Sequence, residues 1–261
     1  MPMITASDGT TLNYRIDGDG SLPPMLLSNS LGSTLDMWEP QIPALTDHFR
    51  VIRYDNRGHG NSDVPEGPYT IERIALDAKE LLEKLNPGPV AFCGLSLGGM
   101  VGMWLLANAP QLLSRAVIAN SSAYFGQPEL WNQRLAMVQN DGMQVVAEGT
   151  IQRWLTKDFM DKDPIETAKL IAMIADTPPD GYVAAATAVR DVDLRADLAK
   201  ITSPVLVIAG ALDPSTPPVM AEAIADGIAN ARLAILDAAH LSNVERADEF
   251  DRLIINFLSH E

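Results

Sequence analysis

The run Gly94-Leu95-Ser96-Leu97-Gly98 places a serine between two glycines, just after the apolar residues 90–93 and before a segment that we expect to be helical. Glycine at positions 94 and 98 removes the Cβ atoms that would clash in a sharp strand-to-helix turn, so this turn can hold Ser96 with its Oγ above a sheet. The N–H groups at the start of the helix would point at the same place. The pattern therefore predicts a nucleophilic serine. An ordinary turn with Ser96 as a helix N-cap is the alternative, and a dinucleotide-binding loop is excluded because it needs glycine at position 96.

A serine hydroxyl is a weak nucleophile, so catalysis by Ser96 requires a histidine to accept its proton and a carboxylate to orient that histidine. In open α/β sheets such partners lie in loops at the carboxyl ends of strands. Asp213 and His240 follow predicted strands and complete the chain order serine, acid, histidine that is typical of this kind of turn. We therefore predict a catalytic triad of Ser96, Asp213 and His240. The alternatives are a surface-loop role for His240 and, for the acid, Asp191, Asp193 or Asp237.

Two backbone N–H groups are candidates for stabilising the oxyanion that this chemistry forms. The N–H of Leu97 follows the nucleophile, and the N–H of Leu31 lies in a loop of small residues after the predicted strand 25–27. The side chains of both leucines would then be incidental to catalysis. Ser30, beside Leu31, is either a further hydroxyl donor or a turn residue, and both interpretations stay open.

Composition and charge limit the classes of partner. The 261 residues are 47% hydrophobic, carry a formal net charge of −15 and include one cysteine, Cys93. We expect a folded globular protein whose negative charge excludes nucleic acid and anionic membranes as partners. Because no signal-like or membrane-length apolar run occurs and no disulfide can form within the chain, we expect a cytoplasmic protein. No cluster of His, Cys, Asp and Glu has metal-ligand spacing, so we expect neither a metal nor a cofactor. The sequence indicates no oligomeric state.

Strand and helix patterns alternate along most of the chain, which predicts an α/β fold with a mostly parallel sheet and helices on both of its faces. Asp8-Gly9 predicts a hairpin between strands 3–5 and 11–16. Further strands are predicted at 25–27, 50–54, 90–93, 115–119, 205–209 and 231–236, and helices at 35–45, 71–85, 100–108, 217–226 and 247–258.

Between residues 121 and 189 the pattern changes to helices alone, at 128–139, 143–155, 164–175 and 181–189. Four helices without an intervening strand predict an inserted helical cap. We expect a core of residues 1–121 and 190–261 and a cap of residues 122–189.

These segments together resemble the α/β-hydrolase superfamily. The superfamily's nucleophile turn, its Asp-x-Arg-Gly-x-Gly-x-Ser loop, its acid after a late strand and its final histidine match residues 94–98, residues 55–62, Asp213 and His240. The resemblance covers the chain from end to end except for the cap, and it implies the α/β-hydrolase fold. One departure is that many members carry His-Gly before the oxyanion residue, where this chain has Asn29-Ser30.

A closer resemblance is to the 3-oxoadipate enol-lactonases of aromatic catabolism. The similar runs are 28–32, 210–213 and 236–243, together with 131–134, 153–155 and 177–182 in the cap. The resemblance implies that water opens a five-membered enol-lactone with a carboxymethyl group to 3-oxoadipate, through an acyl-enzyme, as a step of the β-ketoadipate pathway. The alternatives are a carboxylesterase or another lactonase with the same triad, and a non-catalytic ligand-binding member of the fold.

An anionic lactone in a strongly acidic protein needs a local cation, and a guanidinium suits a carboxylate best. Arg134 and Arg153, both in the predicted cap, are the candidates, with Arg190 behind them. The alternative for each arginine is a solvated charge on a helix surface. Trp131 and Trp154 are candidates for the pocket wall between cap and core, with ordinary packing as their alternative.

Overall fold

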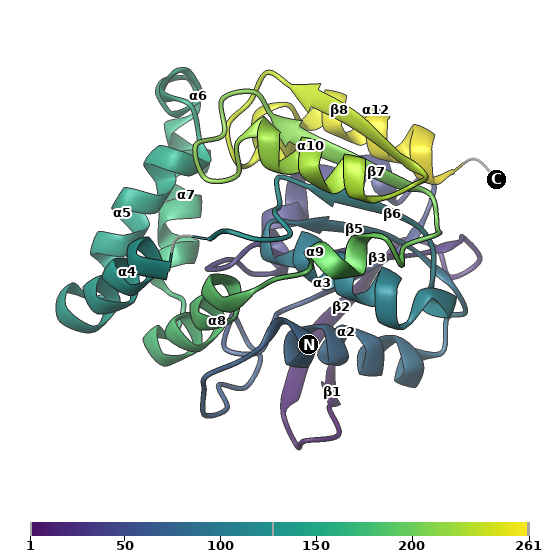
Figure 1. Cartoon of the computed structure of the whole chain (residues 1–261), viewed down its shortest axis with the longest axis horizontal. Coiled ribbons are helices and arrows are strands. Elements are labelled where there is room, and N and C mark those ends of the chain that lie inside the picture. Colours follow the sequence, from purple (N-terminus) through teal and green to yellow (C-terminus); the bar gives the residue numbers. More distant parts are fainter. Residues whose placement is uncertain (1, 127, 260–261) are drawn as a thin grey trace.

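The sheet in the computed structural model, which describes residues 2–126 and 128–259, contains eight strands in the order β1-β2-β4-β3-β5-β6-β7-β8 (Figure 1). The β1–β2 and β2–β4 pairs are antiparallel, and the pairs from β4 through β8 are parallel. The strands are β1 (Met3–Thr5), β2 (Thr11–Asp17), β3 (Pro24–Ser28), β4 (Arg50–Tyr54), β5 (Val90–Leu95), β6 (Leu113–Ala119), β7 (Val205–Gly210) and β8 (Ala231–Leu236). The predicted hairpin and the mostly parallel sheet are confirmed.

The central strands are apolar because helices cover both faces of the sheet. All residues of β5 and β7 are buried. The edge strand β8 differs, since Leu233 and Ile235 on it are exposed. The buried strands β5 and β7 lead directly into the loops that carry Ser96 and Asp213, so the best-packed part of the sheet positions these side chains.

Helices pack on both faces of the sheet, as the sequence predicts. One face carries α2 (Ile71–Leu85), α3 (Leu97–Asn108), α9 (Arg195–Leu198) and α10 (Pro218–Gly227), and the other carries α1 (Ile42–Leu45), α11 (Ser242–Glu245) and α12 (Ala247–Leu258). Short 3₁₀ helices form at η1 (Leu35–Gln41) and η2 (Pro110–Leu112). The helix predicted over 35–45 therefore divides into η1 and α1, because Pro40 lies inside it and has no N–H to donate. Among the described residues, no helix is both long and apolar enough to cross a membrane.

In the described part of the chain, five helices lie between β6 and α9, where the sequence analysis expected four. They are α4 (Pro128–Asp141), α5 (Met143–Trp154), α6 (Lys157–Lys162), α7 (Pro164–Ala175) and α8 (Pro179–Asp191), and Figure 1 shows them grouped at one end of the sheet. Helix α6 is the one not predicted, because its short polar sequence has no apolar period; the side chain of Thr156 caps it by accepting from Phe159 N–H. We call α4–α8 the cap helices.

The cap helices meet the core near α8 and near the end of α5. A Cβ on Gly181 of α8 would lie 2.1 Å from the carbonyl oxygen of Gly58, so glycine is needed for this close approach. At the end of α5, Leu241 N–H donates to the carbonyl oxygen of Trp154 at 2.9 Å. The second contact joins the cap to the loop that carries His240.

Candidate active site

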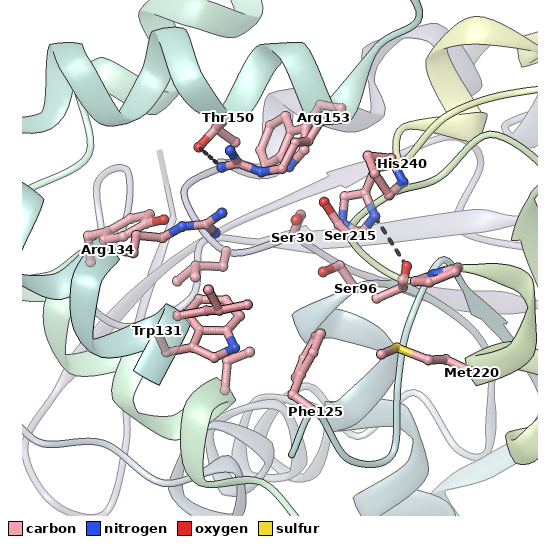
Figure 2. Close-up of a pocket in the computed structure, with 18 residues that line it drawn as sticks. Ser30, Ser96, Phe125, Trp131, Arg134, Thr150, Arg153, Ser215, Met220 and His240 are labelled. Atoms are coloured by element: carbon pink, nitrogen blue, oxygen red, sulfur yellow. Dashed lines mark hydrogen bonds between the residues drawn. The ribbon is translucent and has the colours of Figure 1, made fainter. Parts of the chain in front are cut away.

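A pocket of about 280 Å³ lies between the cap helices and the loops at the carboxyl ends of the strands (Figure 2). Ser96 and His240 line the core side of this pocket, and Arg134 and Arg153 line the cap side. The other predicted residues in the pocket wall are Leu31, Trp131 and Trp154. The structure thus brings together residues from distant parts of the chain around one cavity.

Ser96 occupies the sharp turn between β5 and α3, with φ 58° and ψ −112°. A positive φ is strained for a serine, and such strain is typical of a nucleophile turn. A Cβ on Gly94 would lie 2.2 Å from Gly98 O, and one on Gly98 would lie 2.0 Å from Ser28 O. The turn therefore requires both glycines. Ser96 stands at the N-cap position of α3, but among the described residues its side chain makes no capping hydrogen bond, so its hydroxyl is not used to cap the helix.

His240 and Asp213 form a buried pair, and His240 lines the same pocket as Ser96. His240 Nδ1 lies 2.8 Å from Asp213 Oδ2, and their side chains are 3% and 0% exposed. Burial raises the pKa of Asp213, but the charge of His240 and the hydrogen bonds from His240 and Thr216 outweigh burial and leave this pKa below its ordinary value. An ionised Asp213 holds the imidazole with Nδ1–H toward the carboxylate, which leaves Nε2 for the serine. Figure 2 shows Ser96 and His240 among the side chains that surround the pocket.

Asp213 is held by further donors that the sequence analysis missed. Its Oδ1 accepts the N–H groups of Ser215 and Thr216 at 2.8 and 3.0 Å, and its Oδ2 accepts Thr216 Oγ1 at 2.6 Å. Asn120 Nδ2 donates to the same Oδ2 at 3.1 Å and to Ala239 O at 3.2 Å. Asn120 directly follows the buried strand β6, and this position was the signal that could have identified it.

The other acids considered for the triad pair with arginines instead. The pairs are Asp191 with Arg190 at 2.7 Å, Asp193 with Arg195 at 2.6 Å, and Asp237 with Arg246 at 2.8 Å. None of these acids is among the described residues that line the pocket, and Arg190 is not among them either. Arg190, the candidate ranked after Arg134 and Arg153, has its guanidinium engaged by Asp191 and Asn132.

The loop after β3 presents the Leu31 N–H between two neighbours whose N–H groups are engaged. Ser30 N–H donates to Met37 Sδ at 3.3 Å, and Gly32 N–H donates to His59 Nε2 at 2.9 Å. Within residues 2–126 and 128–259, no protein acceptor meets the Leu31 N–H. This N–H is therefore available to a bound molecule. Ser30 also lines the pocket, and Figure 2 shows it near Ser96.

The second expected oxyanion donor, the N–H of Leu97, belongs to the first residue of α3. The first N–H groups of a helix have no partner within that helix, so the Leu97 N–H can serve a ligand at Ser96. Removal of one such donor typically costs about 3 kcal/mol of transition-state stabilisation.

His59 supports the Leu31 loop and was not identified from the sequence. Its Nδ1 lies 3.1 Å from the carbonyl oxygen of Arg57, and its Nε2 accepts from Gly32. Burial lowers the pKa of His59, which favours the neutral ring that this pattern requires, with Nδ1–H as donor and Nε2 as acceptor. Its place in the glycine-rich run 55–62 was the available signal.

Arg134 and Arg153 are cationic groups in a pocket wall without carboxylates. None of the described residues that line the pocket is Asp or Glu, and neither arginine forms a salt bridge with another described residue. Arg153 donates to Thr150 Oγ1 at 3.2 Å, and the Arg134 guanidinium lies over the Trp131 ring at 4.9 Å. Burial and the charge of Arg134 lower the pKa of Arg153 to about 10, so Arg153 is cationic at neutral pH. This wall is suited to an anion.

The two tryptophans of the pocket wall, Trp131 and Trp154, differ in burial and in packing partner. Trp131 is half-buried and packs edge-on against Phe125, with ring centroids 5.5 Å apart. Trp154 is buried, and the centroid of its ring lies 6.3 Å from the centroid of the His240 ring. Both tryptophans therefore pack within the protein and also border the pocket.

The described residues include no group of three or more His, Cys, Asp and Glu side chains arranged to hold a metal ion. Cys93 is fully buried in β5, and burial raises the pKa of its thiol. The chemical groups around the pocket are those of nucleophilic acyl transfer.

Comparisons with known proteins agree with this geometry. The sequence profile of a family described as the alpha/beta hydrolase fold matches residues 23–161. The chain is 37% identical to 3-oxoadipate enol-lactonase 2 of Acinetobacter baylyi, over 96% of this chain and 94% of that protein. The enol-lactonase structure from Burkholderia xenovorans superposes with a TM-score of 0.97 at 41% identity, covering 99% of this chain and 100% of that one. A hydrolase structure from Pseudomonas aeruginosa gives a TM-score of 0.96 at 46% identity, covering 99% of this chain and 98% of that one.

Proposed function

Because this chain belongs to the α/β-hydrolase family, we propose that it is a serine hydrolase that opens the anionic ring of 3-oxoadipate enol-lactone to 3-oxoadipate, in the β-ketoadipate pathway. The observation that carries the proposal is the placement of two guanidiniums, without carboxylate partners among the described residues, in the same pocket as Ser96 and His240. The enol-lactonases among the relatives support the same substrate class. In this proposal residues 122–189 act as a cap over a core of residues 1–121 and 190–261.

The first half of the reaction forms an acyl-enzyme. Ser96 Oγ attacks the lactone carbonyl carbon while His240 Nε2 takes the hydroxyl proton. The N–H groups of Leu31 and Leu97 stabilise the oxyanion. The bond from the carbonyl carbon to the ring oxygen then breaks, and His240 returns the proton to the departing enolate, which becomes the ketone. A conjugated enolate is a better leaving group than a simple alkoxide, so the barrier to ring opening is low for an ester.

The second half releases the product. Water attacks the acyl carbon while His240 accepts a proton from it, and the same N–H groups stabilise the second oxyanion. Ser96 leaves with the proton from His240, and the acyl group departs as a carboxylic acid, which ionises by releasing its proton to solvent. One water molecule is consumed, and the serine and histidine return to their starting states.

Arg134 and Arg153 would bind the carboxylate that the substrate carries before the ring opens. A charge-assisted hydrogen bond to a guanidinium contributes about 1.5–3 kcal/mol. Trp131 and Trp154 would border the lactone ring. The arginines would hold the end of the substrate that does not react. Holding that end would orient the lactone carbonyl over Ser96.

Steady-state ring opening by wild-type protein and by Ser96→Ala tests the proposal directly. We expect Ser96→Ala to lose at least about 10⁴-fold in kcat and to lose labelling by a fluorophosphonate probe. A Ser96→Ala protein that opens the lactone at the wild-type rate would refute the acyl-enzyme. A wild-type protein that the probe does not label would favour a non-catalytic ligand-binding role.

A general carboxylesterase, or a lactonase for neutral substrates, is a second candidate, because several apolar side chains also line the pocket. These are Phe125, Leu130, Val189 and Met220. The ratio of kcat/KM for the carboxylated enol-lactone to kcat/KM for its methyl ester separates the candidates. A preference for the anion supports the enol-lactonase, and equal values favour the second candidate.

A further inference from the structure

Glu245, at the end of α11, connects the cap to the loop that carries His240. One carboxylate oxygen, Oε1, accepts the N–H of Thr156, the residue just before α6. The other oxygen, Oε2, accepts the N–H of Ala239 at 2.5 Å. Glu245 is half-buried and does not belong to the described residues that line the pocket. One carboxylate thus holds backbone groups of the cap and of the core together.

A second hydrogen bond runs beside this connection. Leu241 N–H donates to Trp154 O at 2.9 Å. The two links attach the residues on either side of His240, 239 and 241, to the residues on either side of Leu155, 154 and 156. The short segments that carry His240 and Leu155 are therefore held side by side.

Arg153 directly precedes this attached segment. Its backbone is continuous with Trp154, and its guanidinium faces the pocket (Figure 2). The core side of the same attachment carries His240, which would act on the lactone carbonyl. The distance between the carboxylate-binding end and the reacting end of the pocket consequently depends on this attachment.

Glu245 is central to the attachment because few other hydrogen bonds join this part of the cap to the core. Among the hydrogen bonds of the described residues, the Thr156–Glu245 and Leu241–Trp154 bonds join the end of α5 and the turn after it to the core, while α4 is joined at Asn132 to Arg190 at the end of α8. Ala184 of α8 accepts from Tyr69 N–H at 3.2 Å, but this bond lies on another helix. Without Glu245, the end of α5 would keep one hydrogen bond to the core.

We propose that Glu245 is a positioning residue that holds Arg153 at a fixed distance from His240, and so sets the preference for an anionic substrate of matching length. This proposal rests on the proposed function for the role of Arg153. A carboxylate suits the task because its two oxygens can each accept one N–H, whereas an amide offers one oxygen and an N–H₂ group that would oppose the second N–H.

The matched control is Arg246, the next residue. Arg246 donates to Asp237 O at 2.7 Å and to Asp237 Oδ2 at 2.8 Å, on the same loop as His240. It makes no hydrogen bond to the cap helices among the described residues. Arg246→Gln therefore loosens the His240 loop without touching the connection to the cap.

The kinetic test compares Glu245→Ala, Glu245→Gln and Arg246→Gln on the carboxylated enol-lactone and on its methyl ester. Misplacement by about 1 Å can reduce rate by 10²-fold, so we expect the anion-to-ester ratio of kcat/KM to fall on the order of tenfold in Glu245→Ala, mainly through KM for the anion. Glu245→Gln should retain part of the ratio, and Arg246→Gln should retain all of it. An unchanged ratio in Glu245→Ala, or equal losses on both substrates, would overturn the proposal.

Hydrogen exchange on the unliganded proteins tests the attachment without any substrate. In Glu245→Ala we expect faster exchange for peptides that contain Thr156 and Ala239, unchanged exchange in β5 and β7, and no change at Thr156 in Arg246→Gln. Wild-type exchange at Thr156 in Glu245→Ala would overturn the proposed attachment. If wild-type protein shows no preference for the anion, the proposed function fails while the exchange experiment still decides whether Glu245 fastens the cap.

Discussion

The core side and the cap side of the pocket differ in how their charged groups are satisfied. On the core side, the Asp213 carboxylate accepts hydrogen bonds from His240, Thr216, Ser215 and Asn120. On the cap side, the guanidinium of Arg153 has Thr150 as its hydrogen-bond partner and the positive charge of Arg134 as a neighbour. Hydrogen bonds within the protein stabilise the charge of Asp213, whereas the charges of Arg134 and Arg153 lack a counter-ion among the described residues.

Under the proposed function, this difference separates two tasks, catalysis on the core side and recognition of the anion on the cap side. Catalytic groups must have a fixed geometry before substrate arrives, because reorganisation during the reaction would raise the barrier. Groups that recognise an anion gain most when the anion is their first good partner, because a resident carboxylate would compete with it. If the proposed function holds, the uncompensated charges in the cap would lower its local stability for the sake of binding.

The largest effect should come from disturbing the core side. Asp213→Asn keeps the shape of the side chain but removes the charge that orients His240, so we expect kcat to fall by about 10³–10⁴-fold with little change in KM. Thr216→Val, which removes one donor to the same carboxylate, is the milder comparison and should lose about tenfold or less. Steady-state ring opening measures both variants, and a near-wild-type kcat in Asp213→Asn would show that another acid serves His240.

Removing a cap charge should affect one substrate only. Arg153→Gln should lower kcat/KM for the carboxylated lactone by about 10²-fold, as expected for the loss of a charge-assisted hydrogen bond. The methyl ester should react at nearly the wild-type rate, and Arg153→Lys should recover part of the loss on the anion. Equal losses on both substrates would mean that Arg153 shapes the pocket rather than binds the carboxylate.

Stability should move in the opposite direction to activity on the cap side. Arg153→Met removes a partly buried charge that faces Arg134 and keeps an apolar chain of similar length, so we expect the free energy of unfolding to rise by about 1 kcal/mol. Urea unfolding of Arg153→Met, with the exposed Lys162→Met as control, measures this. Destabilisation by Arg153→Met would contradict the view that its charge is poorly compensated.

His59, which supports the Leu31 loop, should make a smaller, pH-dependent contribution to the free energy of unfolding. Burial lowers the pKa of His59 below its ordinary value of 6.5, so the folded state binds fewer protons than the unfolded chain, and the contribution of His59 to stability falls as the pH drops below that value. Between about pH 7.5 and 5.5, the free energy of unfolding should therefore fall less in His59→Gln than in the wild-type protein. The difference between the two decreases should be a few tenths to about 1 kcal/mol. The exposed His48→Gln is the control for urea unfolding at each pH, and identical pH dependence in His59→Gln and wild type would show that His59 does not titrate in this way.

The arrangement of strands and helices was largely predictable, because the patterns that define them are local. Buried parallel strands are short and wholly apolar, as in β5 and β7. The two errors in the predicted helices also have local causes. Pro40 divides a predicted helix, and α6 is too short and polar to show a helical period.

The site was predictable only in part. Its serine follows from glycine spacing, and the positions of Asp213 and His240 follow from the rule that ligands bind beyond the carboxyl ends of parallel strands. Asn120, His59 and Glu245 escaped notice, because a lone polar residue in a loop has many possible roles until its partners are known.

The sequence by itself determined the strained turn at Ser96, because the clashes that demand glycine at 94 and 98 follow from the turn itself. It also determined the alternation of apolar strands and helices that builds the sheet. Only the tertiary structure decided which of four acids meets His240, that Arg190 is engaged by Asp191 while Arg153 faces the pocket, and that Glu245 joins cap to core. The reason is that charge pairing depends on distances between segments far apart in the chain, and sequence spacing does not specify those distances.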